Sequence, residues 1–430
     1  MRADFPFRPA AFPFFYGWVI FGAATLGVIM SVPGQTMGVS VFTDSLIEAT
    51  GLSRLSISNA YLLGTLASGL LLPLGGSLVD RFGVRLGVVA ACAGLACSLV
   101  FLANSDRLAP TLAVAWGLLA LGFAGIRFFG QGMLTLTSRT MLGRWFDRRR
   151  GLVSALSGPF TNFAFASAPL LLAFWIGVSG WRGAWMEMAL VVGVGMGFVG
   201  WLLFRENPEE CGLQMDGEPA PAHDPETGAP PPPAEERHFT RAEALRTGAF
   251  WLVTLGIANQ AMVGTGITFH IVDLGAEFGL TRQQAVAIFL PIALVSTPIG
   301  LLAGAATDRV PVRYLMMAMM AGQIVMFASA ANLGDPWLRA AAIAGWGFSS
   351  GFYGPLTVAA MPNFFGRTHL GAIQGAMMMV LVIASALGPS ALAVVKVAFG
   401  SYGPGLYALT ALPAAVLLAA PFTRDPVGGE

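Results

Sequence analysis

Residues 76–85 read GSLVDRFGVR, and residues 304–313 read GAATDRVPVR. Both segments keep a glycine, an Asp-Arg pair and a final arginine at one spacing, although Pro311 replaces the second glycine of the first segment. The segments lie 228 residues apart, and the same offset relates GLSR at 51–54 to GLTR at 279–282. Matches repeated at one offset indicate a duplicated unit whose two copies have the same orientation.

The residue types of the repeated segment suit the end of a helix. Glycines allow a tight turn and close approach of two helices. The aspartate can bond to neighbouring helix termini and to an arginine of an adjacent bundle. Farther along the chain, Gly151 and Pro169 correspond to Gly371 and Pro389 at an offset of 220 residues, which extends the duplication.

The composition is that of a membrane protein. Of 430 residues, 55% are hydrophobic and 11% charged, with a net charge of +1, whereas a soluble domain carries about 25% charged residues. Because there is no basic excess, a nucleic-acid partner is excluded. Three cysteines and four histidines, without metal-ligand spacing, predict neither a disulfide framework nor a metal site nor a cofactor. We expect the lipid bilayer to surround most of the chain.

Twelve apolar runs are long enough to cross a bilayer, since about 20 residues suffice for one helix. Residues 205–246 are acidic and contain four consecutive prolines, which is typical of an extended linker. The predicted fold is an all-α integral membrane protein with two six-helix bundles, 1–204 and 247–430, in a 6+6 parallel repeat around a central cavity. The runs are 14–42, 53–77, 84–104, 109–137, 151–176, 182–204, 247–274, 282–306, 312–332, 337–360, 369–394 and 402–422.

The distribution of basic residues predicts the orientation. If the N-terminus is cytoplasmic, most of the 24 Lys and Arg residues fall in the inner loops and in the linker. The positive-inside rule then places both termini in the cytoplasm. Prolines and an acid interrupt the N-terminus, so we read the first apolar run as a retained anchor rather than a signal peptide. We expect a multi-pass plasma-membrane protein of the bacterial inner-membrane type, functional as a monomer.

The pattern G-x-x-x-D-R-x-G-x-R at 76–85 resembles the signature loop of the major facilitator superfamily. The sequence WFDRRRG at 145–151 resembles the loop between spans four and five in the monocarboxylate and oxalate–formate branch of that superfamily, and FFGR at 364–367 resembles its weaker counterpart. The superfamily resemblance covers all twelve runs. It implies a secondary transporter that works by alternating access, with its substrate site at the membrane midplane between two halves.

The resemblance also implies a role for the repeated loop. In the family it forms an inner latch that holds the outward-facing state and breaks on switching; the alternative is a charge cluster that only sets topology. The latch candidates are Gly76, Asp80, Arg81, Gly83, Arg85, Asp308, Arg309 and Arg313.

The chain departs from the branch in one respect. Oxalate–formate porters are expected to carry one basic residue within span eight and another within span eleven. Here the corresponding runs have only Arg282 at the outer mouth and Lys396 at the outer end. Because the pair of cations that would clamp a dicarboxylate is missing, the sequence disfavours oxalate as the substrate.

Arg127 is the basic residue that lies deep within a run. An arginine at this depth costs at least ~2.5–3.5 kcal/mol to insert, and no acid lies at a comparable depth. Gln131, Thr135 and Ser138 follow on its helical face. Arg127 could bind one substrate carboxylate through a bidentate pair. Alternatively, it belongs to a motif like the family's R-x-x-Q-G, with one extra residue before Gln131, and braces helices or relays protons.

Other polar residues within the runs are candidates for substrate binding. Gln35 follows the helix-breaking pair Pro33-Gly34, and broken helices expose backbone groups. Tyr61 lies on a polar face that can equally be a packing stripe, and Asn162 is open to either role. The candidates in the second half are Asn259, Gln260, Tyr353 and Gln374.

His270 is the histidine that falls within an apolar run. Since an imidazole titrates near physiological pH, His270 could couple proton uptake to substrate binding. The alternative is a histidine that merely satisfies its hydrogen bonds near the membrane interface.

Together these features predict a secondary transporter and no enzyme, since no nucleophile–base motif, zinc motif or P-loop is present. One deep arginine and no deep acid favour a small organic anion, a monocarboxylate, moved by proton symport or by anion exchange. The alternative is multidrug or other small-molecule efflux, in which an embedded acid would normally bind a cationic substrate.

Overall fold

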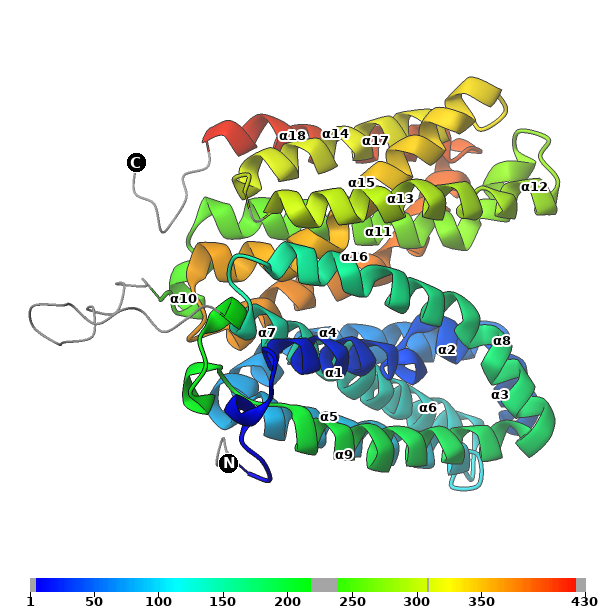
Figure 1. The fold of residues 1–430 in the computed structure, drawn as a ribbon. Helices are drawn as coiled ribbons and strands as arrows, with labels where there is room; N and C mark the ends of the chain where they lie inside the picture. Colours follow the sequence, from blue (N-terminus) through cyan, green and yellow to red (C-terminus); the bar gives the residue numbers. More distant parts are fainter. Residues whose placement is uncertain (1–4, 218–237, 308, 423–430) are drawn as a thin grey trace, which may run out of the picture. The chain divides into compact units, whose positions relative to one another are not determined.

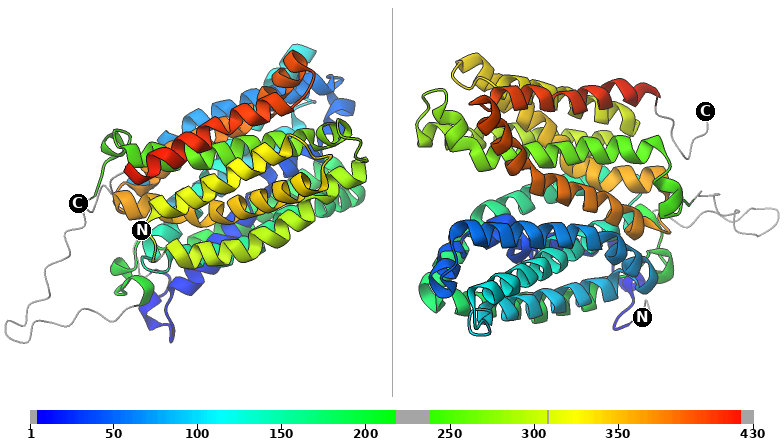
Figure 2. Two further views of the ribbon diagram at one scale, coloured as in Figure 1. Left: turned by 90° about the horizontal axis from the view of Figure 1, so that it is seen from above. Right: turned by 180° about the vertical axis from the view of Figure 1, so that it is seen from behind.

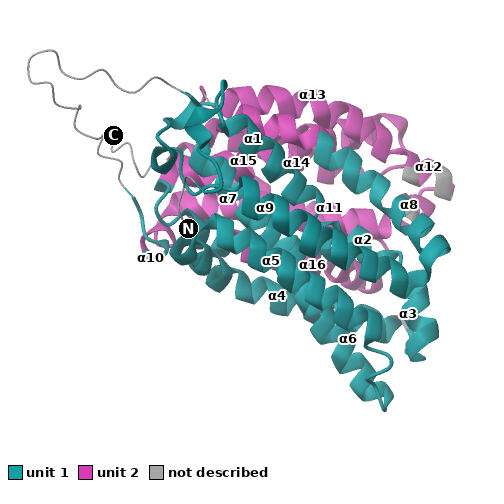
Figure 3. Ribbon diagram, turned by 60° about the horizontal axis from the view of Figure 1, so that its bottom comes forward, with its two compact units in different colours: residues 1–149, 160–242, 365–376 teal, residues 150–159, 243–364, 377–430 magenta. Residues whose placement is uncertain are grey.

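The computed structural model describes residues 5–217, 238–307 and 309–422, and the regular elements in these ranges are helices (Figure 1). Contacts divide the chain into two compact units (Figure 3). Unit 1 holds residues 1–149, 160–242 and 365–376, and unit 2 holds residues 150–159, 243–364 and 377–430. The predicted all-helical membrane fold is confirmed.

Unit 1 begins with a broken helix. α1 (Gly17–Ile29) ends before the turn η2 (Val32–Gly34), where Pro33 cannot continue the helical hydrogen bonds. The chain then continues through α2 (Thr36–Ser40) and α3 (Thr43–Thr50). The long elements that follow are α4 (Arg54–Phe82), α5 (Val84–Asn104), α6 (Leu112–Ile126), η3 (Arg127–Leu134), α7 (Thr135–Trp145), most of α8 (Arg150–Leu190), η4 (Val191–Met196) and α9 (Gly197–Leu203).

Unit 2 contains the second set of long helices, and α14 and α18 pack against each other within it (Figure 2). Its helices are α11 (Gly248–Ala276), α12 (Arg282–Ala287), α13 (Phe289–Thr307), α14 (Val312–Ala330), α15 (Pro336–Phe365), most of α16 (Leu370–Phe399), α17 (Gly403–Leu409) and α18 (Ala411–Ala419). Short elements at the ends and in the linker are η1 (Pro9–Ala11), η5 (Glu209–Cys211), η6 (Met215–Gly217), α10 (Arg241–Ala244) and η7 (Ala420–Phe422).

Ten helical segments in the described ranges are long and apolar enough to cross a membrane. The predicted run 337–360 is helical too and lies within α15. The predicted runs 151–176 and 182–204 are joined, because α8 continues from one into the other with Gly180 (φ 70°, ψ 166°) as its non-helical residue. The left-handed φ of this residue favours glycine, which turns the chain between the two runs.

The glycines that mark the sequence repeat make equivalent contacts within each unit. In unit 1, a Cβ added to Gly76 of α4 would collide with the carbonyl oxygen of Gly371, which begins α16. In unit 2, a Cβ added to Gly151 of α8 would collide with the carbonyl oxygen of Gly304 in α13. The division into one bundle that ends at residue 204 and another that begins at 247 stays a prediction. The contact units differ from it, because the glycine pairs bring the first residues of α16 into unit 1 and those of α8 into unit 2.

Helices α11 and α16 approach each other closely in unit 2. A Cβ on Gly388 of α16 would collide with the carbonyl oxygen of Met262 in α11. Beside this contact, the hydroxyl groups of Thr265 and Ser385 share a hydrogen bond of 2.8 Å. Backbone-to-backbone packing of this kind requires small residues in the contact.

We therefore expect Gly388→Ala to destabilise the protein by about 1–3 kcal/mol, because the added methyl group has to push two backbones apart. Gly264→Ala in α11 is the matched control, since a Cβ there meets nothing within 4 Å. The control should keep or raise the melting temperature, because alanine is the better helix former. The melting temperatures of the purified variants decide, and equal values for both would contradict this packing.

Candidate functional site

The guanidinium of Arg127 lies against the break in the first helix. The Arg127 side chain is 5% exposed, and its Nη1 donates a 3.0 Å hydrogen bond to the carbonyl oxygen of Gly34. Gly34 ends the turn η2, so its carbonyl points out of the helical ladder and can accept this bond. The broken helix thus supplies a neutral acceptor for the buried cation.

Gly34 also contacts the segment that begins with Arg127. A Cβ on Gly34 would lie 2.7 Å from the backbone nitrogen of Gln131 and 2.9 Å from Cα of Gly130. Residues Arg127–Leu134 form a π-helical segment, η3. A π-helical turn holds one residue more than an α-helical turn, so it absorbs the extra residue that precedes Gln131 in the predicted motif. π-helical segments are frequent at functional sites.

Three further candidates surround this contact. The Arg127 guanidinium lies 5.5 Å from the centre of the Tyr61 ring, a cation–π distance. Tyr61 donates a hydrogen bond of 3.0 Å to Thr36 Oγ1, and Gln35 donates one of 3.0 Å to Ser31. The structure therefore brings Gln35, Tyr61, Arg127 and Gln131 together around Gly34, and we call these four residues the arginine site.

Two polar atoms at the arginine site lack partners in the described structure. The Nε atom of Arg127 and the Oε1 atom of Gln131 are buried without a hydrogen bond. An unsatisfied buried donor costs about 1–3 kcal/mol, more when it is charged. The site is therefore short of one acceptor for its cation. Farther along the helix, the predicted polar residues Thr135 and Ser138 are buried as well.

Two candidates of unit 2, Asn259 and Gln260, lie on α11 and donate hydrogen bonds to neighbouring helices. Asn259 donates a 2.8 Å hydrogen bond to Gln323 Oε1 of α14, and Gln323 donates one of 3.0 Å to the carbonyl oxygen of Gly256. Gln260 donates a 3.0 Å bond to Ser350 Oγ. The fully buried Gln323 was not among the sequence candidates; a glutamine in the middle of an apolar run was the signal that could have found it.

The remaining candidates lie on the helices α16, α15 and α8. Gln374, at the start of α16, accepts a 2.8 Å hydrogen bond from Thr140 of α7. Tyr353 is half-buried on α15, and Asn162 is exposed on α8. The roles of these residues in substrate binding stay predictions.

His270 is held by polar groups on both sides of its ring. Its Nε2 atom lies 2.9 Å from the carbonyl oxygen of Pro389 in α16. Its Nδ1 atom lies 3.1 Å from the hydroxyl of Tyr402, which in turn donates a 2.7 Å hydrogen bond to Asp273. Neither Tyr402 nor Asp273 was a sequence candidate for this site. Tyr402 lies 132 residues from the histidine, and without Tyr402 the sequence gives no link between Asp273 and the imidazole.

Asp80, in the first copy of the repeated loop, binds the start of α16. Its carboxylate accepts hydrogen bonds of 2.8 Å from the Gly371 amide and 2.6 Å from the Ala372 amide. It also forms a 2.9 Å ion pair with Arg144, and the two side chains are only 9% and 7% exposed. Asp80 thus caps a helix N-terminus, where an anion is favoured by the unpaired amides.

Glu206 completes this charge network, although it lies in the predicted linker 205–246. Its carboxylate forms a 3.1 Å ion pair with Arg144 and accepts hydrogen bonds from the Val84 and Arg85 amides at the start of α5. A Cβ on Gly83 (φ 91°) would collide with this carboxylate. The sequence missed Glu206 because a linker rich in acids and prolines gives no sign of which acid folds back.

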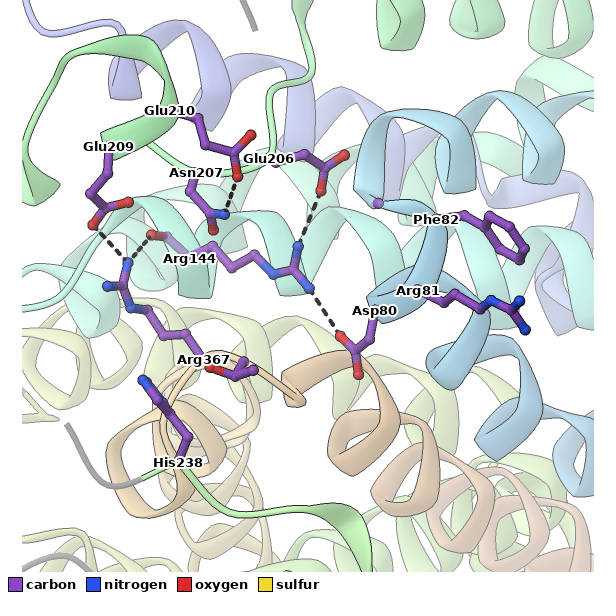
Figure 4. Close-up of a pocket in the computed structure, with 12 residues that line it drawn as sticks. Asp80, Arg81, Phe82, Arg144, Glu206, Asn207, Glu209, Glu210, His238 and Arg367 are labelled. Atoms are coloured by element: carbon purple, nitrogen blue, oxygen red, sulfur yellow. Dashed lines mark hydrogen bonds and ion pairs between the residues drawn. The ribbon is translucent and has the colours of Figure 1, made fainter. Parts of the chain in front are cut away.

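The network borders a cavity of about 480 Å³ within unit 1 (Figure 4). Figure 4 shows Arg144 between Asp80 and Glu206, with Arg367 bonded to Glu209 and to the Arg144 carbonyl. Of the predicted latch residues, Arg85 is buried and donates a 2.6 Å bond to the Trp201 carbonyl. Arg81 is exposed, and its guanidinium lies over the ring of Phe82. Arg81 is therefore adjacent to the charge network of Asp80, Arg144 and Glu206 but is not part of it.

The second copy of the loop is less completely described. Asp308 lies outside the described residues, as do 218–237 of the predicted linker. Arg309 is exposed, and the guanidinium of Arg313 lies 5.0 Å from the ring of Tyr314. Arg150, at the start of α8, bonds to Asn363 at 2.7 Å.

Removing the charge of Asp80 should deprive the buried Arg144 of one of its two counter-ions, with Glu206 as the other. We expect Asp80→Asn to destabilise the protein by about 2–5 kcal/mol. The double variant Asp80→Asn/Arg144→Gln should lose less than the sum of the two single variants, because the two side chains interact directly.

Glu210→Gln is the control for this cycle, since Glu210 lines the same cavity but is exposed. Thermal melting of the four proteins gives the coupling. Additive losses, or an Asp80→Asn protein as stable as the control, would show that the ion pair contributes nothing.

Comparison with known families agrees with this geometry. The family described as the Major Facilitator Superfamily matches residues 9–389 of the chain. The monocarboxylate transporter 11 of Homo sapiens is 25% identical over 333 residues, which are 74% of this chain and 64% of that protein. The oxalate:formate antiporter of Oxalobacter formigenes is 21% identical over 263 residues, 61% of this chain and 56% of that protein. The match thus spans less than two thirds of either relative.

Solved structures share the fold. The proton:xylose symporter XylE, bound to 6-bromo-6-deoxy-D-glucose, is similar at a TM-score of 0.67 with 16% identity, over 95% of this chain and 96% of that one. The human organic anion transporter MFSD10 reaches a TM-score of 0.63 with 14% identity, over 94% and 99%. With the repeated loops, the helical fold and a family match over most of its length, the chain belongs to the Major Facilitator Superfamily, a family of membrane transporters and not of enzymes.

Proposed function

We propose that the protein is a secondary active transporter that moves a small organic anion, a monocarboxylate, by alternating access. The observation that carries the proposal is the arginine site. Arg127 is buried and keeps one donor, Nε, without a partner, and it forms no ion pair with any described residue. A carboxylate would supply both the missing charge and the missing acceptor.

The neighbours of Arg127 support this assignment. Its partners, the Gly34 carbonyl and the Tyr61 ring, are neutral, so they hold the guanidinium without cancelling its charge. Gln35 and Gln131 add amide groups that can bond to a hydroxyl or carboxylate. In the second half, we assign Asn259, Gln260, Tyr353 and Gln374 to substrate binding, with Asn162 as a further substrate contact.

The curated relatives favour the same chemistry. One is named a monocarboxylate transporter and the other an oxalate:formate antiporter, so both names describe the handling of small carboxylates. With a single deep arginine, a substrate with one carboxylate fits this chain better than a dicarboxylate. Proton symport, with His270 as the coupling residue, or anion exchange would drive the movement.

The remaining features fit a transporter of this kind. We assign the network of Asp80, Arg144 and Glu206 to a cytoplasmic latch that has to break at each cycle. The excess of basic residues on that side supports cytoplasmic termini in a plasma membrane of the bacterial inner-membrane type. A monomer is sufficient for this mechanism, and the lipid bilayer is its solvent.

Arg127→Gln should weaken carboxylate binding about 10–100-fold, because a hydrogen bond to a charged group contributes about 1.5–3 kcal/mol. Arg127→Lys keeps the charge but loses the two-pronged contact, so it should fall between wild type and Arg127→Gln. Arg107→Gln, an exposed arginine in a predicted outer loop, is the control. The measurement is uptake of labelled monocarboxylates by reconstituted vesicles, and a wild-type KM and rate in Arg127→Gln would refute the assignment.

Thermal shift of the wild-type protein tests the substrate class independently. We expect lactate-, glycolate- or formate-type acids to raise its melting temperature, since a ligand stabilises the folded state that binds it. Oxalate should act more weakly. Stabilisation by organic cations alone would favour the alternative, a multidrug or other small-molecule efflux transporter.

His270→Ala should abolish the dependence of uptake on the proton gradient, because the imidazole is the group placed to take up a proton near neutral pH. Phe399→Ala is the control, since the Phe399 ring on α16 is 66% exposed. The measurement compares accumulation driven by an imposed pH gradient with exchange at equal pH, which distinguishes proton symport from anion exchange. A His270→Ala protein that still accumulates substrate on a proton gradient would exclude this residue from coupling.

A further inference from the structure

We propose that His270 does not act alone, and that His270, Tyr402 and Asp273 together form one proton-binding relay. The inference rests on the proton-coupled transport proposed above and adds two positioning residues to it. Tyr402 precedes α17 and Asp273 lies one turn after His270 on α11, so the relay joins two separate elements of unit 2.

The geometry of the relay is a continuous chain of short contacts. Nε2 of His270 lies 2.9 Å from the Pro389 carbonyl, and Nδ1 lies 3.1 Å from the Tyr402 hydroxyl. The Tyr402 hydroxyl lies 2.7 Å from Asp273 Oδ2. The Tyr402 side chain is buried, whereas Asp273 is exposed, so the chain runs from a buried ring to an accessible carboxylate.

Counting hydrogens shows what this chain of contacts requires. A carbonyl oxygen only accepts, so Nε2 of His270 must carry a hydrogen. Tyr402 has a single hydroxyl hydrogen, and an ionised Asp273 can only accept it. Nδ1 then needs its own hydrogen to bond to Tyr402, which makes His270 an imidazolium beside a carboxylate. The other solution is a protonated Asp273 that donates to Tyr402 while Tyr402 donates to neutral His270.

Both solutions contain the same number of protons. Each holds one proton more than a neutral His270 with an ionised Asp273, and each has no net charge. After loss of that proton, the single hydroxyl hydrogen of Tyr402 faces two acceptors, Nδ1 of His270 and the carboxylate of Asp273. Tyr402 can then donate to only one of them, and its bond to the other is lost. The three contacts therefore form together only when the relay has bound a proton.

The surroundings hold Tyr402 in place for this role. Its backbone amide donates to the carboxylate of Glu277, which also pairs with Lys396 and accepts a 3.1 Å bond from Ser401. In both proton arrangements the Tyr402 hydroxyl keeps its hydrogen and donates it to one of its two neighbours. The Tyr402 hydroxyl can therefore reorient its hydrogen, while the backbone of Tyr402 stays held by Glu277.

Two charged neighbours of the relay are Glu277 on the end of α11 and Lys396 of α16, whose Nζ lies 5.1 Å from the Tyr402 ring. The helices α12, α14 and α18 also pack against α11. α12 begins with Arg282, α14 carries Arg313 and Tyr314 in its first turn, and α18 contains no ionisable residue. Here α11 is lined by the buried side chains of Ile267 and Ile271. A dry apolar wall strengthens the interaction between the imidazolium and its acceptor.

The relay also explains how one proton could affect helix packing. His270 and Asp273 belong to α11, Pro389 to α16, and Tyr402 to the segment that leads into α17. When the proton is bound, a single chain of hydrogen bonds ties these three elements together. When it leaves, the tie between α11 and Tyr402 loses one of its two bonds.

The test is the titration of His270 by NMR of protein labelled with ¹⁵N-histidine. The chain has only four histidines, so the His270 signal is assigned by its loss in His270→Gln. Spectra of the purified, substrate-free protein are recorded from about pH 5 to pH 9. Tyr402→Phe and Asp273→Asn should each move the midpoint to lower pH by about one unit or more, because the imidazolium loses its acceptor or its counter-charge.

Non-additivity is the sharper part of the test. In a relay, Tyr402→Phe already disconnects Asp273, so the double variant should shift the midpoint no further than the larger single change. Tyr407→Phe, an exposed tyrosine on α17, is the control and should leave the midpoint unchanged. Midpoints of both single variants equal to wild type would overturn the relay, and so would two shifts that simply add.

This measurement is independent of transport. A failure of proton-coupled transport would appear as proton-independent uptake in vesicles, with the shifts of the His270 midpoint still present. A failure of the relay would appear as unchanged midpoints, even if uptake by the wild-type protein follows the proton gradient.

Discussion

The solvation of one arginine within the membrane is the constraint on which the first half of the structure depends. Arg127 cannot remain without partners in an apolar surrounding, and the chain offers it no carboxylate at its depth. The structure meets the requirement with backbone: α1 stops at Pro33-Gly34, and the freed Gly34 carbonyl accepts from the guanidinium. The π-helical segment η3 then lets Gly34 approach Gln131. Helix break, π-helical turn and arginine form one arrangement, and each would be unfavourable without the other two.

A second principle is visible where helices begin. Acids distant in sequence cap helix N-termini: Glu206 caps α5, and Asp80 caps α16. Arg144 lies between the two carboxylates and is neutralised by both. Charge is thus placed where unpaired amides can share it. In the other unit Arg150, at the start of α8, donates a 2.7 Å hydrogen bond to the neutral side chain of Asn363.

Much of the fold could be predicted from the sequence, because hydrophobic length and repeated motifs are local properties. The apolar runs coincide with helices, the loop at 76–85 pointed to the family, and Arg127 stood out through its depth. The partners of these residues could not be predicted. Glu206 lies in a segment with the composition of a linker, Gln323 reaches Asn259 from another helix, and Tyr402 meets His270 across 132 residues. A hydrogen bond depends on angles and distances between helices, which no single run of sequence contains.

The sequence by itself determined that this chain is helical, duplicated and embedded in a membrane, because each of these follows from the order of apolar and charged residues. It also determined that Arg127 would lie deep within an apolar run. Only the tertiary structure decided what this cation touches, which acids become helix caps and which groups His270 contacts. These outcomes depend on how closely two backbones can approach, and that distance is set by glycines such as Gly34, Gly76 and Gly388 together with the residues packed against them.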